Sequence, residues 1–184
     1  GEVAYRCQHV FCPAQLKENL IDFASRAAMD IEGMGEATVD QLVENKLVSD
    51  YGDIYSLKFE KVRSLERMGD KSARNLIEGI GKSKDNTLSR FIYALGIRHV
   101  GEHIADVLAR TFHSMDKISE LTVAELPKTP EIGPVVAQSI YDFFRNPDSK
   151  KALKKLRDAG IRFAERPRSA ATMRLAGKTF VFTG

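Results

Sequence analysis

Four glycines occupy equivalent places in a pattern that recurs along this chain of 184 residues. Each glycine follows an apolar residue. A small or β-branched residue comes four positions later, and Leu or Ile comes seven positions later. A glycine directly before an amphipathic helix lets a ligand approach the backbone closely, and the first N–H groups of that helix attract phosphate. The pattern therefore predicts phosphate-binding turns at Gly35, Gly69, Gly101 and Gly133.

The spacing of these glycines, 34, 32 and 32 residues, indicates an internal repeat rather than isolated turns. In a helix-hairpin-helix unit, such a turn joins two helices, and the second helix presents its first N–H groups as an anion site that needs no charged side chain. Two units packed as a pseudo-symmetric pair can hold both strands of a duplex through phosphates, which carry no sequence information. We expect an all-α fold with four such motifs in two pseudo-symmetric pairs.

The side chains around the four turns differ in charge. The first turn lies between Glu32 and Glu36, so we expect it to be mainly structural. The second lies in a basic stretch and is the best predicted phosphate site, followed by the third. The fourth has Lys128 before it and Glu131 within it. The predicted DNA-binding residues are Gly33, Gly35, Arg67, Gly69, Lys71, Ser72, Arg98, His99, Gly101 and Gly133.

Charge is distributed unevenly, although the formal net charge is only +3. Residues 57–90 hold 9 basic and 5 acidic side chains, and residues 145–184 hold 11 and 3, whereas residues 1–56 hold 4 and 10. A polyanion should therefore meet the second repeat and the C-terminal region first. The alternative for these charges is a solvated helix surface, with Arg74 and Glu78 as an i,i+4 pair.

A basic helix is predicted near the end of the repeats, and it could contact a DNA backbone or simply face solvent. Its basic residues are Lys150, Lys151, Lys154, Lys155 and Arg157.

Cys7 and Cys12 are the only cysteines, and their spacing fits half of a zinc site. His9 lies between them as a possible third ligand, but its place in the loop is tight, so bound zinc is not expected within this chain alone. No catalytic residues are predicted: the chain has no phosphate-loop lysine motif, no Lys-x-Asp-Gly and no His-Glu-x-x-His. Two cysteines fit a reducing cytosol. No apolar run approaches the roughly 20 residues that cross a bilayer, and no secretory signal is found.

The expected helices follow from apolar periodicity and from residues that start and stop helices. Asp70 is expected to cap the second helix of the second repeat, with Gly81 as its stop, and Thr122 with Glu125 forms a predicted capping box. The sequence predicts helices over residues 14–28, 36–45, 59–64, 70–80, 87–95, 102–111 and 122–126, from Pro134 onward, and over 148–159.

Five ordered segments carry a family resemblance. They are Cys-Pro-Ala-Gln-Leu (12–16), Phe-Ala-Ser-Arg-x-Ala-Met-Asp-Ile-Glu-Gly-Met-Gly (23–35), Leu-Glu-Arg-Met-Gly-x-Lys-Ser-Ala (65–73), Arg-Phe-Ile-Tyr-Ala-Leu-Gly-Ile-Arg-His-Val-Gly (90–101) and Gly-Lys-Thr-Phe-Val-Phe-Thr-Gly (177–184). Together they resemble the C-terminal half of a bacterial NAD-dependent DNA ligase. The resemblance implies the end of a four-cysteine zinc finger at 1–13, a helix-hairpin-helix domain at 14–163, a linker at 164–176 and the first strand of a BRCT domain at 177–184.

The resemblance also implies a function. The whole enzyme would seal nicks in double-stranded DNA during replication and repair, using NAD and magnesium in an adenylation domain that precedes residue 1, with zinc in the intact finger. This segment would bind nicked duplex independently of sequence, as part of a cytoplasmic monomer without a membrane contact. The alternatives are a helical protein-interaction scaffold and a base-excision glycosylase. The glycosylase fits poorly, because Asp142 follows the fourth turn too soon.

Overall fold

The computed structural model describes residues 13–164 as a helical assembly, with no strand among these residues beyond an isolated bridge between Ser114 and Ala164. The helices are α1 (Pro13–Ala24), α2 (Glu36–Glu44), α3 (Tyr51–Ile54), α4 (Phe59–Arg63), α5 (Asp70–Ser83), α6 (Leu88–Ala94), α7 (Glu102–Phe112), α8 (Met115–Glu120), the 3-10 helix η1 (Leu126–Lys128), α9 (Pro134–Arg145) and α10 (Pro147–Asp158). The predicted all-α fold is confirmed.

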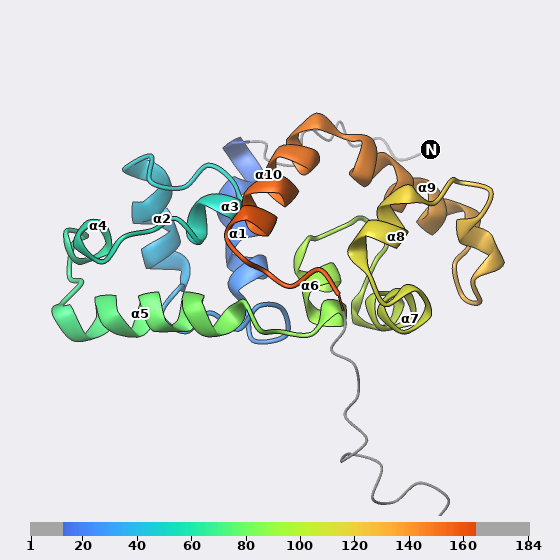
Figure 1. The fold of residues 1–184 in the computed structure, drawn as a ribbon. Helices are drawn as coiled ribbons and strands as arrows, with labels where there is room; N and C mark the ends of the chain where they lie inside the picture. Colours follow the sequence, from blue (N-terminus) through green and yellow to red (C-terminus); the bar gives the residue numbers. More distant parts are fainter. Residues whose placement is uncertain (1–12, 165–184) are drawn as a thin grey trace, which may run out of the picture.

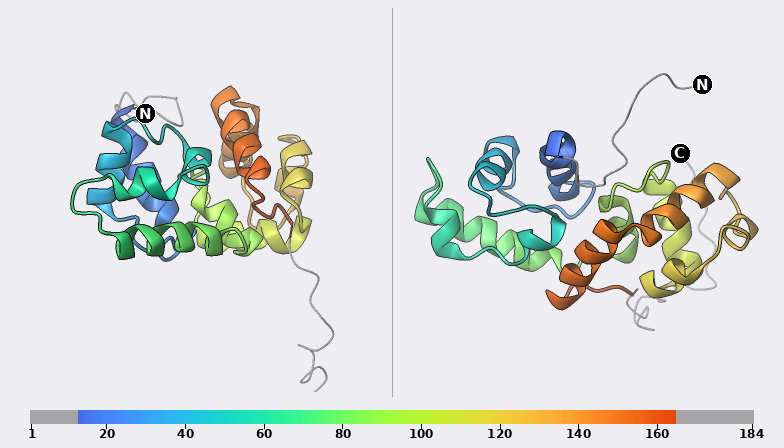
Figure 2. Two further views of the ribbon diagram at one scale, coloured as in Figure 1. Left: turned by 60° about the vertical axis from the view of Figure 1, so that its left-hand side comes forward. Right: turned by 90° about the horizontal axis from the view of Figure 1, so that it is seen from above.

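The molecule is elongated, with hairpins at both ends (Figure 1). Helices α1, α2, α4 and α5 form one end and are called here the first hairpin pair, residues 13–83. Helices α6 to α9 form the other end and are called the second hairpin pair, residues 88–145. Helix α10 belongs to neither pair and runs across the middle next to α3, as the views in Figure 2 also show. The two helices of each hairpin pack on each other, α1 on α2, α4 on α5, α6 on α7 and η1 on α9.

The repeat pattern is explained by burial. The residues four and seven positions after each glycine are fully buried; they are Val39, Leu42, Ala73, Leu76, Ala105, Leu108, Ala137 and Ile140. The residue before each glycine is buried in three turns, while Met68 is half-buried. The apolar face of each second helix therefore holds its hairpin together, and the glycine stays on the surface.

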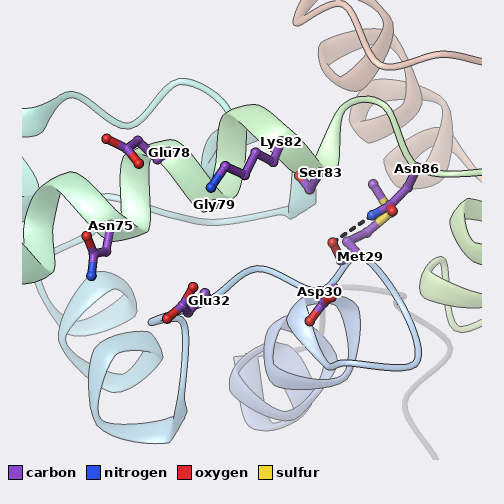
Figure 3. Close-up of a pocket in the computed structure, with 9 residues that line it drawn as sticks. All are labelled: Met29, Asp30, Glu32, Asn75, Glu78, Gly79, Lys82, Ser83 and Asn86. Carbon is purple, nitrogen blue, oxygen red and sulfur yellow. Dashed lines mark hydrogen bonds between the residues drawn. The ribbon is translucent and has the colours of Figure 1, made fainter.

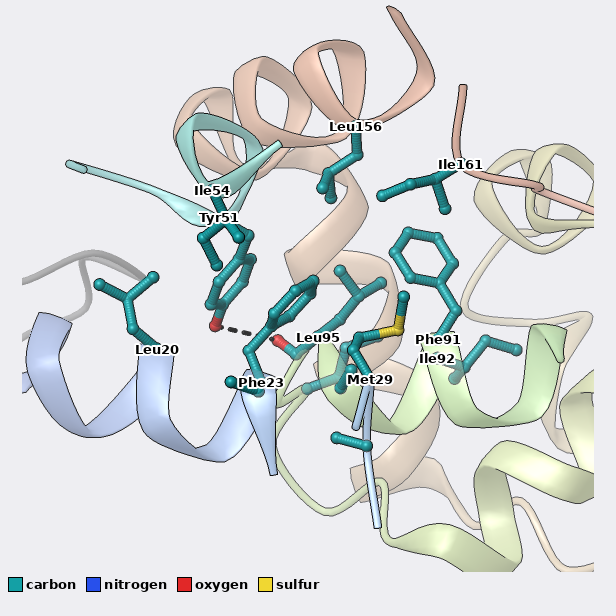
Figure 4. Close-up of a cluster of buried hydrophobic side chains, with 14 of the residues drawn as sticks. Leu20, Phe23, Met29, Tyr51, Ile54, Phe91, Ile92, Leu95, Leu156 and Ile161 are labelled. Carbon is teal, nitrogen blue, oxygen red and sulfur yellow. Dashed lines mark hydrogen bonds between the residues drawn. The ribbon is translucent and has the colours of Figure 1, made fainter. Parts of the chain in front are cut away.

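The core is continuous from the first hairpin pair to the second (Figure 4). Phe23 of α1 stacks on Tyr51 of α3 with ring centroids 4.7 Å apart, and the Tyr51 hydroxyl donates to the Leu95 carbonyl oxygen at 3.5 Å. Phe91 of α6 packs on Phe163, which follows α10, at 5.1 Å. Because burial of apolar surface is the main driving force of folding, this shared core ties the two pairs into one unit.

Two expected helix ends are wrong. Helix α1 ends at Ala24 rather than near residue 28, because the chain reverses there and the N–H of Met29 donates to the carbonyl oxygen of Phe23. Helix α5 continues through Gly81 to Ser83. Its Gly79 is needed for packing, since a Cβ there would come within 3.2 Å of the Glu32 backbone.

Two predicted capping arrangements also differ. Asp70 is the first residue of α5 rather than its cap; Gly69 takes the cap position, and Asp70 pairs with Arg63 at 2.6 Å. Residues 122–125 form a turn that leads into η1 instead of a helix. The expected partnership is nevertheless present in that turn, because the Glu125 carboxylate accepts from the N–H and the hydroxyl of Thr122 at 2.9 and 2.7 Å.

Short helices α3 and α8 were not predicted, because four and six residues are too few to show a helical period. The predicted zinc-finger end through residue 12, the linker beyond residue 164 and the strand at 177–184 lie outside the described residues. Among residues 13–164, no helix has both the length and the apolar character needed to cross a bilayer.

Candidate nucleic-acid interface

The four predicted turns share one backbone geometry that the sequence pattern did not reveal. The residue two positions before each glycine has a positive φ, +84° at Gly33, +59° at Arg67, +64° at His99 and +68° at Glu131. In each turn, the N–H of the residue before the glycine donates to the carbonyl oxygen three positions earlier, at 3.3, 3.2, 2.9 and 3.2 Å in chain order. The repeat is therefore a repeat of backbone conformation as well as of sequence.

Each repeat glycine is the N-cap of the second helix of its hairpin. All four have φ between −84° and −77° and extended ψ, a conformation open to any residue. A Cβ at any of them would meet no atom within 4 Å. Ser, Asp and Asn cap helices better than Gly, yet no turn uses one. The fold therefore does not require glycine at these four positions. A glycine would, however, allow an external group to approach the first N–H groups of the helix closely.

Gly33 differs from the repeat glycines. Its φ of +84° favours glycine, and a Cβ there would lie 3.7 Å from the Cβ of Leu76 on α5. The first turn also packs against α5 at Gly79 (Figure 3). Beside this contact lies a pocket of about 470 Å³, whose lining includes the acidic Asp30, Glu32 and Glu78 and the basic Lys82. These contacts give the first turn a structural role within the first hairpin pair.

The second turn carries permanent positive charge. Arg67 and Lys71 are exposed on either side of Gly69, and Ser72 is exposed next to them. The one acidic side chain of the first helical turn, Asp70, is paired with Arg63. Its carboxylate therefore opposes an incoming phosphate less than an unpaired one would.

Two side chains near the second turn, one on α5 and one on α2, have roles that the sequence did not indicate. Arg74 lies over the ring of Phe59, 6.0 Å from its centroid, and no ion pair with Glu78 is seen in residues 13–164. Gln41 of α2 holds the second turn at both backbone groups of Glu66. It accepts from the Glu66 N–H at 2.6 Å and donates to the Glu66 carbonyl oxygen at 3.2 Å. Gln41 thus fixes the second turn to the first hairpin.

The third and fourth turns contact each other. Arg98 and His99 are exposed in the third turn, as predicted. His103, in the first turn of α7, contacts the carboxylate of Glu131 in the fourth turn. Val135 at the start of α9 is 63% exposed. The fourth turn therefore offers an acidic and an apolar side chain, neither of which attracts phosphate.

The shared geometry allows the turns to be compared position by position. The residues two before and two after the glycine are Gly33 and Ala37, Arg67 and Lys71, His99 and His103, and Glu131 and Val135 in chain order. The flanking side chains are thus neutral in the first turn, cationic in the second and imidazoles in the third. In the fourth turn, one is acidic and the other is apolar. The second turn thus has the most positive side chains, and the predicted order of the turns as phosphate sites stays a prediction.

The predicted basic helix, α10, uses most of its charge within the protein. Lys155 pairs with Asp50 and Asp53, Arg157 pairs with Asp116, and Lys154 pairs with Asp158. Lys150 and Lys151 are exposed, and no ion pair of theirs is seen between residues 13 and 164. The helix is mainly a structural element, with two lysines left facing solvent.

Both hairpin pairs match known helix-hairpin-helix families. Residues 25–82 match a family described as SAM-like helix-hairpin-helix tandem, and residues 90–153 match one described as helix-hairpin-helix motif. Over its whole length the chain is 48% identical to a protein named DNA ligase from Syntrophomonas wolfei and 47% identical to one from Halothermothrix orenii, covering 28% of each. A DNA ligase from Methylacidiphilum infernorum is 48% identical over 97% of the chain. The chain spans little more than a quarter of the length of these relatives.

Proposed function

We propose that this chain, which is homologous along its whole length to a segment of DNA ligases, binds double-stranded DNA through backbone phosphates within such an enzyme. The observation that carries the proposal is the set of four exposed glycines with open space in front of their helices. Phosphate contacts position a protein on a duplex without reading bases, so binding is independent of sequence. The ten residues predicted to bind DNA stay predictions, with the second turn foremost.

The enzyme as a whole would seal nicks with NAD and magnesium, and this segment would hold the nicked duplex while adenylation takes place elsewhere in the protein. We also propose that Cys7 and Cys12 supply two ligands of a zinc site, as the resemblance implies. Both cysteines lie outside the described residues, and between residues 13 and 164 no group of His, Cys, Asp and Glu side chains forms a metal site. Metal analysis of the full-length enzyme, with Cys7→Ser as the variant, tests this proposal.

Reversing the charge of the second turn tests duplex binding. Arg67→Glu with Lys71→Glu should fold, because Glu131 already occupies the position of Arg67 in the fourth turn and a carboxylate is favourable in a first helical turn. We expect weaker binding to nicked duplex and a slope of log affinity against log salt that is smaller in magnitude by about 1.8, corresponding to two phosphates. Fluorescence anisotropy over a salt series measures both.

Glu32→Gln is the matched control on the first turn. It removes an opposing charge from a turn that packs against α5, so binding should change little. A larger loss in this control than in the double variant would contradict the ranking of the turns. Absence of duplex binding by the unmodified chain at low salt would contradict the proposal and favour the helical protein-interaction module.

A further inference from the structure

Helix α10 and the segment after it contact both hairpin pairs, although they belong to neither. Helix α10 packs on α3 of the first pair and on α9 of the second (Figures 1 and 2). After α10, Arg162 pairs with Asp85 in the connection between the pairs at 3.1 Å. Phe163 packs against Phe91 of α6 with the two rings tilted. The helix-hairpin-helix match ends at residue 153, within α10, so Lys155 and the segment after α10 lie beyond the matched residues.

Lys155 links α10 to the first hairpin pair through two ion pairs. Its Nζ donates to Oδ2 of Asp50 at 2.7 Å and to Oδ1 of Asp53 at 2.6 Å. The Asp50 side chain is only 8% exposed, and its other carboxylate oxygen accepts from the N–H of Gly52 at 2.9 Å. The lysine therefore bonds to the group that caps α3, and it neutralises a carboxylate that burial would otherwise penalise.

Gly52 makes this contact possible. A Cβ at Gly52 would lie 2.3 Å from the Cβ of Lys155 and 2.9 Å from its Cδ. Helix α10 thus lies directly on the backbone of α3, with Leu156 and Ile54 fully buried near the same place (Figure 4). Because this contact is close and combines ion pairs with apolar packing, it fixes the orientation of α10 on α3.

A fixed orientation matters for two binding units on one chain. When two units reach the same ligand at once, the second contact is intramolecular, and affinity rises steeply if the geometry allows both. We propose that Lys155 is a positioning residue that holds the two hairpin pairs at the angle at which both engage one duplex. The inference rests on the proposed function, and Lys155 itself needs no contact with DNA.

Lys155→Met in the full chain tests the inference, because it keeps the apolar stem of the side chain and removes the ammonium group. Affinity is measured for duplexes of increasing length, from those that one hairpin pair can cover to those that reach both. We expect roughly tenfold weaker binding to the long duplexes and less than twofold change for the short ones. Small-angle X-ray scattering without DNA should show a larger radius of gyration.

Lys151→Met is the matched control, since it removes the same charge from an exposed position of the same helix. It should change affinity equally at all lengths and leave the scattering unaltered. If Lys155→Met does not fold, as judged by circular dichroism, Asp53→Asn weakens the same contact more mildly and takes its place.

A folded variant with unchanged scattering and an unchanged dependence on duplex length would overturn the inference. Failure of the unmodified chain to bind any duplex would instead overturn the proposed function. The scattering comparison would still decide whether Lys155 fixes the two pairs.

Discussion

At the residue scale, glycine serves two different purposes in the hairpin turns. Gly33 occupies a left-handed backbone conformation, which L-residues adopt at a cost of about 1 kcal/mol or more. Gly69 has an extended conformation that any residue adopts, with open space around it. The fold thus explains Gly33, whereas Gly69 is explained by the phosphate group that we propose approaches the backbone from outside.

This distinction predicts opposite outcomes for the same substitution. Gly69→Ser introduces a better N-cap, so we expect the free energy of unfolding to rise by a few tenths of a kcal/mol while duplex affinity falls, because the side chain covers the N–H groups. Thermal melts and anisotropy titrations measure the two quantities. Gly33→Ser should instead lower the free energy of unfolding by about 1 kcal/mol. A Gly69→Ser variant that binds duplex as well as the unmodified chain would contradict the assignment.

Arg67 is the clearest case of a side chain kept in an unfavourable backbone conformation at a predicted binding position. Its φ is +59°, and Asn is one of the residues that tolerates this region. We expect Arg67→Asn to leave the melting temperature equal or slightly higher and to weaken duplex binding, with a salt slope smaller by about 0.9. A lower melting temperature with unchanged binding would show that Arg67 serves the fold instead.

At the scale of elements, the contact between α3 and α10 adds to the shared core in placing the two hairpin pairs. Gly52→Ala places a methyl group where the Lys155 side chain already lies, 2.3 Å from its Cβ. Overpacking of this kind typically costs 1–3 kcal/mol, so we expect a loss of about 2 kcal/mol in the free energy of unfolding, measured by urea denaturation. Gly81→Ala is the control. A Cβ at Gly81 meets nothing within 4 Å, and alanine in a helix should stabilise by about 1 kcal/mol.

The same contact predicts how stability depends on pH. Burial opposes ionisation of Asp53, but hydrogen bonds from Lys155 and Ser49 outweigh it and lower the pKa of the carboxyl below its ordinary value. A lowered folded-state pKa stabilises the protein above the unfolded-state pKa of about 3.9, and that contribution is lost as pH falls through the folded-state pKa.

The pKa of Lys155 is shifted in the complementary direction. Burial alone would lower it, but hydrogen bonds to Asp50 and Asp53 raise it above its ordinary value. Its contribution is present below the unfolded-state pKa of about 10.4 and is lost as pH rises through the folded-state pKa. The melting temperature of the unmodified chain should therefore exceed that of Asp53→Asn most clearly between about pH 5 and pH 9, and the difference should shrink below about pH 4. A difference that does not vary with pH would exclude this ion pair as its source.

At the scale of the whole molecule, the shared core predicts cooperative unfolding. Phe23, Tyr51, Phe91 and Phe163 come from both halves of the chain and pack into one buried cluster. Arg90 of α6 adds a polar link, donating to the Ala28 carbonyl oxygen at 2.7 Å. Differential scanning calorimetry should show one transition for residues 13–164, with a calorimetric enthalpy equal to the van't Hoff enthalpy. Two separated transitions would mean that the hairpin pairs fold independently.

The repeat, the helical fold class and the places of the four cap glycines could be predicted from the sequence, because helical periodicity and the turn before each helix are local properties of the chain. The charge of each turn was readable for the same reason. The left-handed residue of each turn was not, since Arg67 and Glu131 are of types that seldom adopt that conformation by their own preference.

Only the tertiary structure separated the basic residues that face solvent from those that hold the fold. Lys155 and Lys151 look alike in the sequence, yet one pairs with a carboxylate 105 positions away and the other is exposed. Pairings across such distances depend on how the helices pack, which local sequence does not encode. The sequence by itself thus determined the residues of the turns. The tertiary packing, in the shared core and between α10 and α3, decided how the two pairs of turns are placed relative to each other.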